Sequence, residues 1–199
     1  LPPGVVNLVT GSGVTVGDYL VEHPKTRFVS FTGSKAVGVG IVEKAARLSP
    51  GQVWIKRVVA EMGGKDCIIV DSEARLTEAV EGVAVSAYGF QGQKCAACSR
   101  VVADAKVYDD FLKLLLDRVK RIKVGPVEDP DNWMGPVVNE RAFASIMGSI
   151  AVGKKEGRLV AGGKAAGGNG YFIQPTVIAD VSRKARIARE EIFGPVLAV

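Results

Sequence analysis

The sequence holds few of the residues on which a disulfide framework or a metal site depends, with three cysteines and one histidine among 199 residues. A small, odd number of cysteines argues against disulfides and favours a reducing compartment, so we expect a cytoplasmic protein, or a mitochondrial matrix protein in a eukaryote. A zinc ion at Cys95 and Cys98 would need further ligands, and only Cys67 and His23 remain, far off along the chain. We predict no metal site, and we interpret Cys67 as strand core and Cys98 as a small packing residue.

Long apolar runs and blocks of like charge are also missing. No apolar stretch approaches the roughly 20 residues that a membrane-spanning helix needs. The net charge of +5 is scattered, without five like charges in a row, which argues against a nucleic-acid or membrane partner. With 47% hydrophobic and 24% charged residues, the composition is that of a globular protein with a core.

The order of the predicted elements in the first third indicates a parallel α/β fold. Apolar, β-branched runs predict three strands, over 5–9, 27–31 and 53–60. A helix over 35–48 has its apolar positions at Val39, Val42 and Ala46. A strand, a helix and a strand at this spacing are typical of a parallel α/β unit.

The alternation starts again after Gly63 and Gly64, which separate two strand-like runs and indicate a domain boundary. The predicted strands are 67–70, 100–103 and the extended run 172–177, and the predicted helices are 76–88, 107–122 and 139–156. The second of these helices is amphipathic, with Phe111, Leu115 and Val119 on one face. The whole chain is therefore predicted to be α/β.

Two reactive side chains stand out because of what surrounds them. Glu61 ends an apolar run before two glycines, and it could either cap backbone amides or, if partly buried with a raised pKa, act as a general base. Cys95 follows the polar stretch 91–94, which argues against a core position. A cysteine alone is more often an inert core thiol, but an exposed one can act as a nucleophile through its thiolate.

A strand-to-helix turn, Phe31-Thr32-Gly33-Ser34, has two interpretations. Amide groups at a helix start, with the positive end of the helix dipole, suit a phosphate, and Gly33 would let the backbone come close. Ser34 could equally be a simple N-cap.

Four segments in this order resemble the aldehyde dehydrogenase superfamily: Phe31-Thr32-Gly33-Ser34, Glu61-Met62-Gly63-Gly64-Lys65, Gly92-Gln93-Lys94-Cys95 and Glu190-Glu191-Ile192-Phe193-Gly194-Pro195-Val196. The residues around Glu61 and Cys95 look most like the 1-pyrroline-5-carboxylate (glutamate semialdehyde) dehydrogenase branch. The resemblance implies part of a Rossmann-type cofactor domain over 1–62 and most of an α/β catalytic domain, truncated, over 63–199. Family members are more than twice this length, so we expect an internal fragment, inactive alone, of a homo-oligomeric enzyme.

The resemblance also implies roles for single residues. Cys95 would attack the aldehyde, its backbone amide would hold the oxyanion, and Glu61 would activate the water that cleaves the resulting thioester. The cofactor would be NAD, with NADP also open. Its contacts would be Gly33 and Ser34 at the pyrophosphate, Gly11 at the adenosine end, Glu191 at the nicotinamide ribose and Phe193 near the nicotinamide. Gly11 could also form a purely structural turn. The expected reaction oxidises L-glutamate γ-semialdehyde to L-glutamate in proline catabolism.

Alternatives stay open at this point. In the resembled branch serine usually follows the nucleophile, and Ala96 stands there instead, which leaves another aldehyde as the substrate. Members that acylate coenzyme A typically lack the base, so Glu61 speaks against them. A non-catalytic relative is disfavoured by intact Glu61 and Cys95. A cysteine hydrolase would have only His23 as a partner, and a thioredoxin-like pair of Cys95 and Cys98 lies at the wrong place in the chain.

Overall fold

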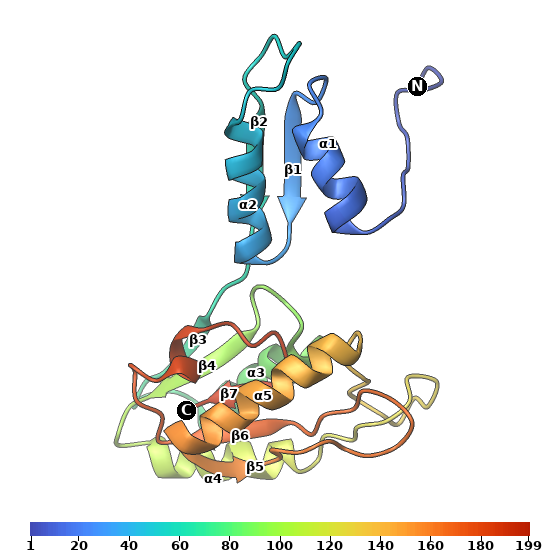
Figure 1. The fold of residues 1–199 in the computed structure, drawn as a ribbon. Coiled ribbons are helices and arrows are strands. Elements are labelled where there is room, and N and C mark those ends of the chain that lie inside the picture. Colours follow the sequence, from blue (N-terminus) through green and yellow to red (C-terminus); the bar gives the residue numbers. More distant parts are fainter. The chain divides into compact units, whose positions relative to one another are not determined.

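The computed structural model describes residues 1–199 and divides into two compact units, Leu1–Gly63 and Gly64–Val199, each with its own sheet (Figure 1). The division falls between the two glycines that separate the strand-like runs. The assignment of cofactor binding to the first unit and thiol chemistry to the second stays a prediction.

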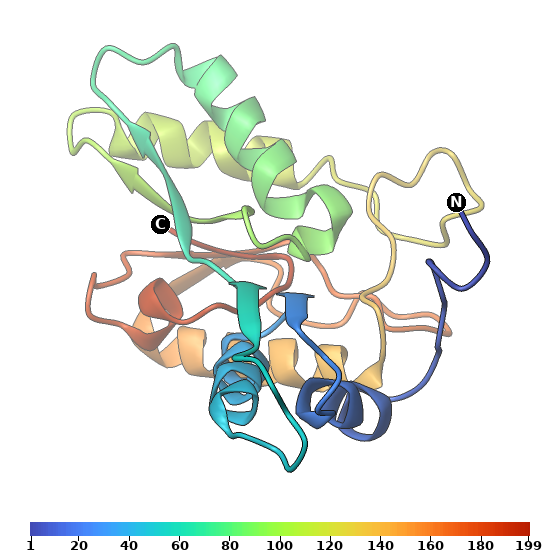
Figure 2. The same cartoon turned by 90° about the horizontal axis from the view of Figure 1, so that it is seen from above.

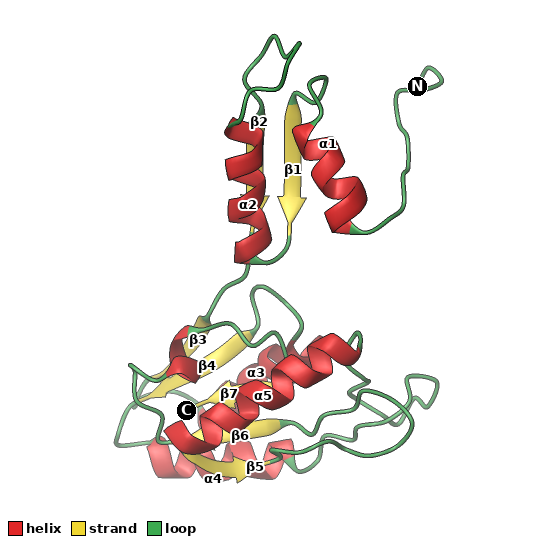
Figure 3. Ribbon diagram, viewed as in Figure 1, coloured by secondary structure: helices red, strands yellow, loops and turns green.

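The first unit is one β-α-β element preceded by a short helical segment (Figure 3). Its elements are the π-helix η1 (Gly13–Gly17), α1 (Asp18–Glu22), β1 (Phe28–Thr32), α2 (Lys35–Ala46) and β2 (Arg57–Glu61). The two strands are parallel, with Thr32 opposite Glu61 at their carboxyl ends. Ser34 caps α2, because its Oγ accepts the N–H of Val37 at 3.4 Å.

Two predictions for this unit are wrong. No strand forms over 5–9, where the apolar side chains are exposed, because no neighbouring strand pairs with that backbone. The third strand begins at Arg57 rather than at 53, since residues before it turn and the Trp54 indole donates to the Thr26 carbonyl at 3.0 Å.

Helix α2 buries a different face from the predicted one. Gly38, Ile41 and Ala45 are buried, whereas Val39 and Val42 are 43% and 49% exposed. A Cβ at Gly38 would lie 2.7 Å from Met62 Sδ, so a larger residue here would displace the Met62 side chain. The core of this unit is small: Val21, Ile41 and Ala45, with Val29, Phe31 and Val58 packed against them.

The second unit is a five-stranded sheet with helices on both faces. Its elements are β3 (Asp66–Val70), α3 (Leu76–Tyr88), the 3-10 helix η2 (Gly89–Gly92), β4 (Cys98–Ala103), α4 (Tyr108–Val119), α5 (Glu140–Glu156), β5 (Arg158–Ala161), β6 (Thr176–Ala179), α6 (Arg186–Arg189) and β7 (Val196–Ala198). The strand order is β3-β4-β7-β6-β5, and all neighbours are parallel except β5 and β6. The predicted α/β class is confirmed, although β5 and α6 were not predicted and the run 172–177 becomes strand only from Thr176.

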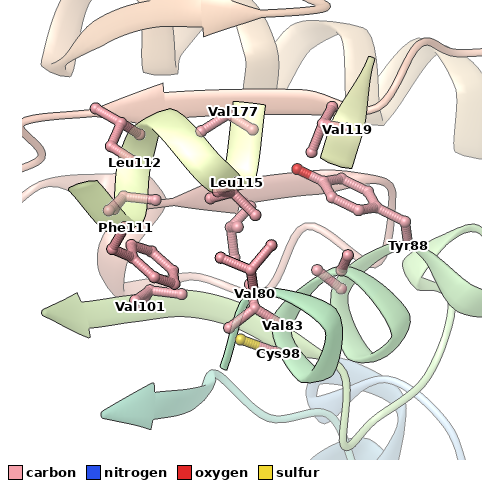
Figure 4. Packing of buried hydrophobic residues seen from close by; sticks show 14 of the residues in the cluster. Val80, Val83, Tyr88, Cys98, Val101, Phe111, Leu112, Leu115, Val119 and Val177 are labelled. Atoms are coloured by element: carbon pink, nitrogen blue, oxygen red, sulfur yellow. The ribbon is translucent and has the colours of Figure 1, made fainter. Parts of the chain in front are cut away.

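The two faces of this sheet carry separate cores. Val177 and Leu197 pack with α3 and α4, whereas their neighbours Ile178 and Ala198 pack with α5 and α6. This is the alternation that a strand buried on both faces requires. Figure 2 shows α3 and α4 on one side of the strands and α5 on the other, and Figure 4 shows the α3–α4 side, where Phe111 and Leu115 are fully buried.

The edge strand β3 corrects one interpretation. Cys67 is exposed rather than core, because it shares the uncovered side of β3 with Ile69, which is 74% exposed. No helix in the structure is both long and apolar enough for a membrane span.

Candidate functional site

Cys95 lies on the surface at the point where the chain turns from η2 into β4. The turn closes through the N–H of Ala97, which donates to the Lys94 carbonyl at 3.2 Å. Cys98, three positions later, is only 3% exposed, and its burial raises the pKa of the thiol to about 11. Of the two sulfurs, only that of Cys95 is therefore placed to meet a substrate.

The backbone before Cys95 has an uncommon conformation. Phe90 (φ 56°) and Gln91 (φ 58°) are both left-handed although neither is glycine, and Gly92 follows at φ 66°. Each such non-glycine residue costs about 1 kcal/mol or more, and sites of this kind cluster where ligands bind. At Gly92 a side chain is excluded twice, because its Cβ would run into the Gly194 carbonyl and lie 2.8 Å from that of Ala87.

Three of the motif segments meet inside the second unit. A Cβ at Gly64 would lie 2.8 Å from the Cys95 carbonyl oxygen, so these two backbones are in contact. The N–H of Gly64 also donates to Glu191 Oε1 at 3.3 Å, across 127 positions of sequence. One small pocket has Gly64, Gly92, Lys94, Glu191 and Phe193 among its lining residues. Glu191 and Phe193, which are expected to contact a cofactor, thus lie beside the backbone of residues 90–95, called the cysteine loop below.

Phe193 has an uncommon backbone conformation, and its ring is only partly buried. It is 45% exposed and has φ 57°, which is rare for an aromatic residue. Gly194 after it cannot carry a side chain, since a Cβ would lie 2.6 Å from two carbons of Ile146. The ring is therefore fixed by packing yet available to a flat ligand.

Lys65 is a feature that the sequence did not reveal as unusual. Its Nζ is buried without a hydrogen-bond partner. Burial first, and then the positive charge of Arg100, lower the pKa of Lys65 to about 8, against the opposing charges of Glu191 and Cys98. No local pattern could have found this, because the groups responsible lie on three distant segments.

The other predicted site residues gather at one end of the first unit's sheet. The N–H of Gly33 donates to the Glu61 carbonyl at 3.0 Å, and Phe31 leaves no room for a side chain at Gly33. The capped start of α2 at Ser34 lies at the same end. In open parallel sheets this carboxyl end is where ligands bind.

Glu61 is exposed, which corrects the expectation of partial burial. The helices cover one face of the two-stranded sheet, and Glu61 alternates onto the other face with Val59, which is 48% exposed. Gly11 has a structural reason to be glycine, since a Cβ there would run into Val16 in η1.

The whole chain, residues 1–199, matches the aldehyde dehydrogenase family, and it belongs to that family. It is 56% identical over 198 residues to the 1-pyrroline-5-carboxylate dehydrogenase of Anoxybacillus flavithermus, covering 100% of this chain and 38% of the relative. The same enzyme of Bacillus subtilis is 53% identical over 199 residues, covering 100% and 39%. The four-motif prediction of the family is thereby confirmed.

Solved structures agree. A crystal structure of 1-pyrroline-5-carboxylate dehydrogenase from Thermus with bound NAD has a TM-score of 0.97 and 54% identity, over 100% of this chain and 38% of that one. The chain thus spans about two fifths of the length of these relatives.

Proposed function

We propose that a polypeptide carrying this chain at its relatives' full length oxidises L-glutamate γ-semialdehyde to L-glutamate with NAD, in proline catabolism. The support is the name shared by relatives at 53–56% identity, together with the resemblance around Glu61 and Cys95. The observation that carries the chemistry is the exposed thiol of Cys95 on a strained loop. The Cys95 carbonyl contacts the backbone of Gly64, whose N–H donates to Glu191.

Cys95 is the proposed nucleophile. Its thiolate forms a bond to the aldehyde carbon, the carbonyl electron pair moves to the oxygen, and the backbone N–H of Cys95 donates to that oxyanion. After oxidation the carbon is held as a thioester. Glu61 then takes a proton from water, the water oxygen bonds to the carbon, and the carbon–sulfur bond breaks, which releases the acid and regenerates the thiolate.

The chain's own residues fit a nicotinamide dinucleotide, which when bound supplies the hydride acceptor. The start of the 12-residue helix α2 offers backbone amides for a pyrophosphate, and Gly33 before it has no side chain to keep a phosphate away. The Glu191 carboxylate suits a ribose diol, because it accepts two hydroxyl protons. The half-exposed ring of Phe193 suits a flat nicotinamide. NAD is the proposed cofactor, with NADP as the alternative.

The test is thiol-dependent NADH formation by the full-length polypeptide. Cys95→Ala should abolish turnover, whereas Cys67→Ala, which removes the other exposed thiol, should leave it intact. Glu61→Gln should trap the acyl group as added mass on Cys95. A Cys95→Ala variant that still makes NADH at the parent rate would overturn the proposal.

Ala96 favours a second candidate substrate. It is exposed on the Cys95 turn and offers no hydroxyl to a substrate carboxylate. A simple aliphatic aldehyde would then be the better substrate. A panel that compares kcat/KM for glutamate semialdehyde with propanal and hexanal decides between the two, and a requirement for coenzyme A would instead indicate the acylating reaction.

We also infer that the full-length protein is a cytoplasmic homo-oligomer. The small number of cysteines supports a reducing compartment, and the family resemblance supports self-association. Light scattering coupled to size exclusion should give at least twice the subunit mass, and a monomer at micromolar concentration would contradict the inference.

A further inference from the structure

Gln93 ties the cysteine loop to a segment 45 positions away. Its Oε1 accepts the backbone N–H of Val138 at 3.0 Å. Gln93 lies two residues before Cys95, and its own N–H donates to the Phe90 carbonyl at 3.0 Å. The side chain therefore joins the loop that carries the thiol to a backbone amide outside it.

Gln91 makes a second connection to the same segment. In the amide orientation that satisfies both ends, its oxygen accepts the N–H of Gly135 at 2.8 Å and its NH2 donates to the Phe90 carbonyl at 3.1 Å. A Cβ at Gly135 would lie only 3.3 Å from the Gln91 side-chain amide, so the glycine eases this approach. Two glutamines on either side of Gly92 thus reach amides only three residues apart.

The segment that receives them is itself fixed on both sides of the sheet. Met134 is 1% exposed in the α3–α4 core, and Val137 is 3% exposed in the α5–α6 core. Their N–H groups are also used, with Met134 donating to Lys123 at 3.1 Å and Val137 to Tyr171 at 3.0 Å. Because both cores hold it, the segment cannot follow a movement of the loop.

We propose that Gln91 and Gln93 are positioning residues for the Cys95 thiol and that the amides of Gly135 and Val138 are their fixed reference points. The inference rests on the proposed function, since it takes Cys95 as the nucleophile. The loop needs this support because two of its residues hold left-handed conformations that an unsupported loop would leave. Attack on a carbonyl requires a near-attack geometry that small displacements destroy.

The experiment uses the full-length polypeptide with two substitutions at one site. Gln93→Met keeps the length of the side chain and removes the acceptor, and Gln93→Glu keeps an acceptor oxygen. We expect kcat of Gln93→Met to fall about tenfold or more, with KM for NAD within about twofold, and Gln93→Glu to keep at least about a third of the parent kcat. Gln174→Met, a glutamine whose side chain makes no such tie, is the matched control and should retain full activity.

Two further results separate positioning from general damage. Amide hydrogen exchange should show lost protection at Val138 in Gln93→Met, while exchange in α3 and α4 is unchanged. If Gln93→Met does not fold, Gln91→Met provides the same comparison through Gly135.

The inference is overturned if Gln93→Met and Gln91→Met both keep kcat within about twofold of the parent, or if Gln93→Glu is as impaired as Gln93→Met. If Cys95→Ala kept the parent turnover, both the proposed function and this inference would be wrong. An inactive Cys95→Ala beside fully active glutamine variants would remove this inference alone.

Discussion

The two units of this chain differ in how much apolar surface they bury. The first unit covers one face of a two-stranded sheet and buries three apolar residues, with Val59 and Phe28 left on the open face. The second unit covers both faces of five strands and has two cores. The contrast explains why the Cys95 loop is held by contacts inside its own unit, whereas Glu61 stands exposed at the end of a half-covered sheet.

The largest expected effect is on independent folding. A fragment of residues 64–199 should unfold cooperatively, whereas residues 1–63 should not, because a two-stranded sheet with so small a core does not offset the entropy of ordering the chain. Circular dichroism during thermal unfolding of the two fragments measures this. A cooperative transition of 1–63 would contradict the contrast between the units.

Core truncations should differ in the same direction. Phe111→Ala removes a fully buried ring and should cost about 3–5 kcal/mol, while Ile41→Ala, at 8% exposure, should cost about 2 kcal/mol. Each unit holds one of the two tryptophans, Trp54 and Trp133, so urea unfolding of single-tryptophan variants of the whole 199-residue chain follows each unit while it is covalently joined to the other. If Phe111→Ala and Ile41→Ala lost equal free energy of unfolding, the core of the first unit would be as well packed as the cores of the second unit.

The stability of the second unit should rise with pH just above neutrality. Lys65 has a pKa of about 8 when folded and 10.5 as its ordinary value, so from about pH 8 upward the unfolded state binds more protons and unfolding becomes less favourable. Above pH 9 the raised pKa of Cys98, about 11, acts in the opposite direction, because the thiol then ionises only when unfolded. The window for Lys65 is therefore pH 8–9.

Urea unfolding followed through Trp133 measures this window. Lys65→Met should flatten the rise between pH 8 and 9, and Cys98→Ala should extend the rise above pH 9. If the free energy of unfolding still rises between pH 8 and 9 in Lys65→Met, another group must cause the rise.

The smallest effects are expected at surface ion pairs. Asp18 and Lys44 in the first unit are 2.5 Å apart and about a third exposed, while Arg118, 16% exposed and stacked on Trp133, meets Glu81 at 2.6 Å in the second. Lys44→Met should cost about 0.5 kcal/mol and Glu81→Gln about 1 kcal/mol. Both losses should shrink in 1 M salt, and a loss above 2 kcal/mol at either site would refute the view of these pairs as minor.

Much of the second unit could be predicted from the sequence because its elements have strong local signals. The helix over 76–88 was predicted with its observed bounds, and Asn139 begins α5 as an N-cap whose Oδ1 accepts the Ala142 N–H at 2.9 Å. The buried face of α4, with Phe111 and Leu115, also follows from its period. Amphipathic periodicity and capping are local, so they survive without knowledge of neighbours.

The candidate site was predictable as motifs and not as geometry. Gly33, Ser34, Glu61, Cys95 and Glu191 could be named from the family resemblance. The left-handed Phe90 and the unpartnered Nζ of Lys65 could not, because each depends on chain segments that the sequence does not bring together. The same is true of the exposure of Cys67, which follows from the place of β3 at the edge of its sheet.

By itself the sequence determined the class of fold, the family and most helix bounds, and it named the candidates for the reactive side chains, since composition, periodicity and motif order are properties of the chain alone. Only the tertiary structure decided which face of α2 is buried, that Cys67 is exposed on an edge strand, and which backbone amides donate hydrogen bonds to the two glutamine side chains next to Gly92. These features depend on groups tens of residues apart that come within hydrogen-bonding or van der Waals distance only when the sheet and its two cores have formed.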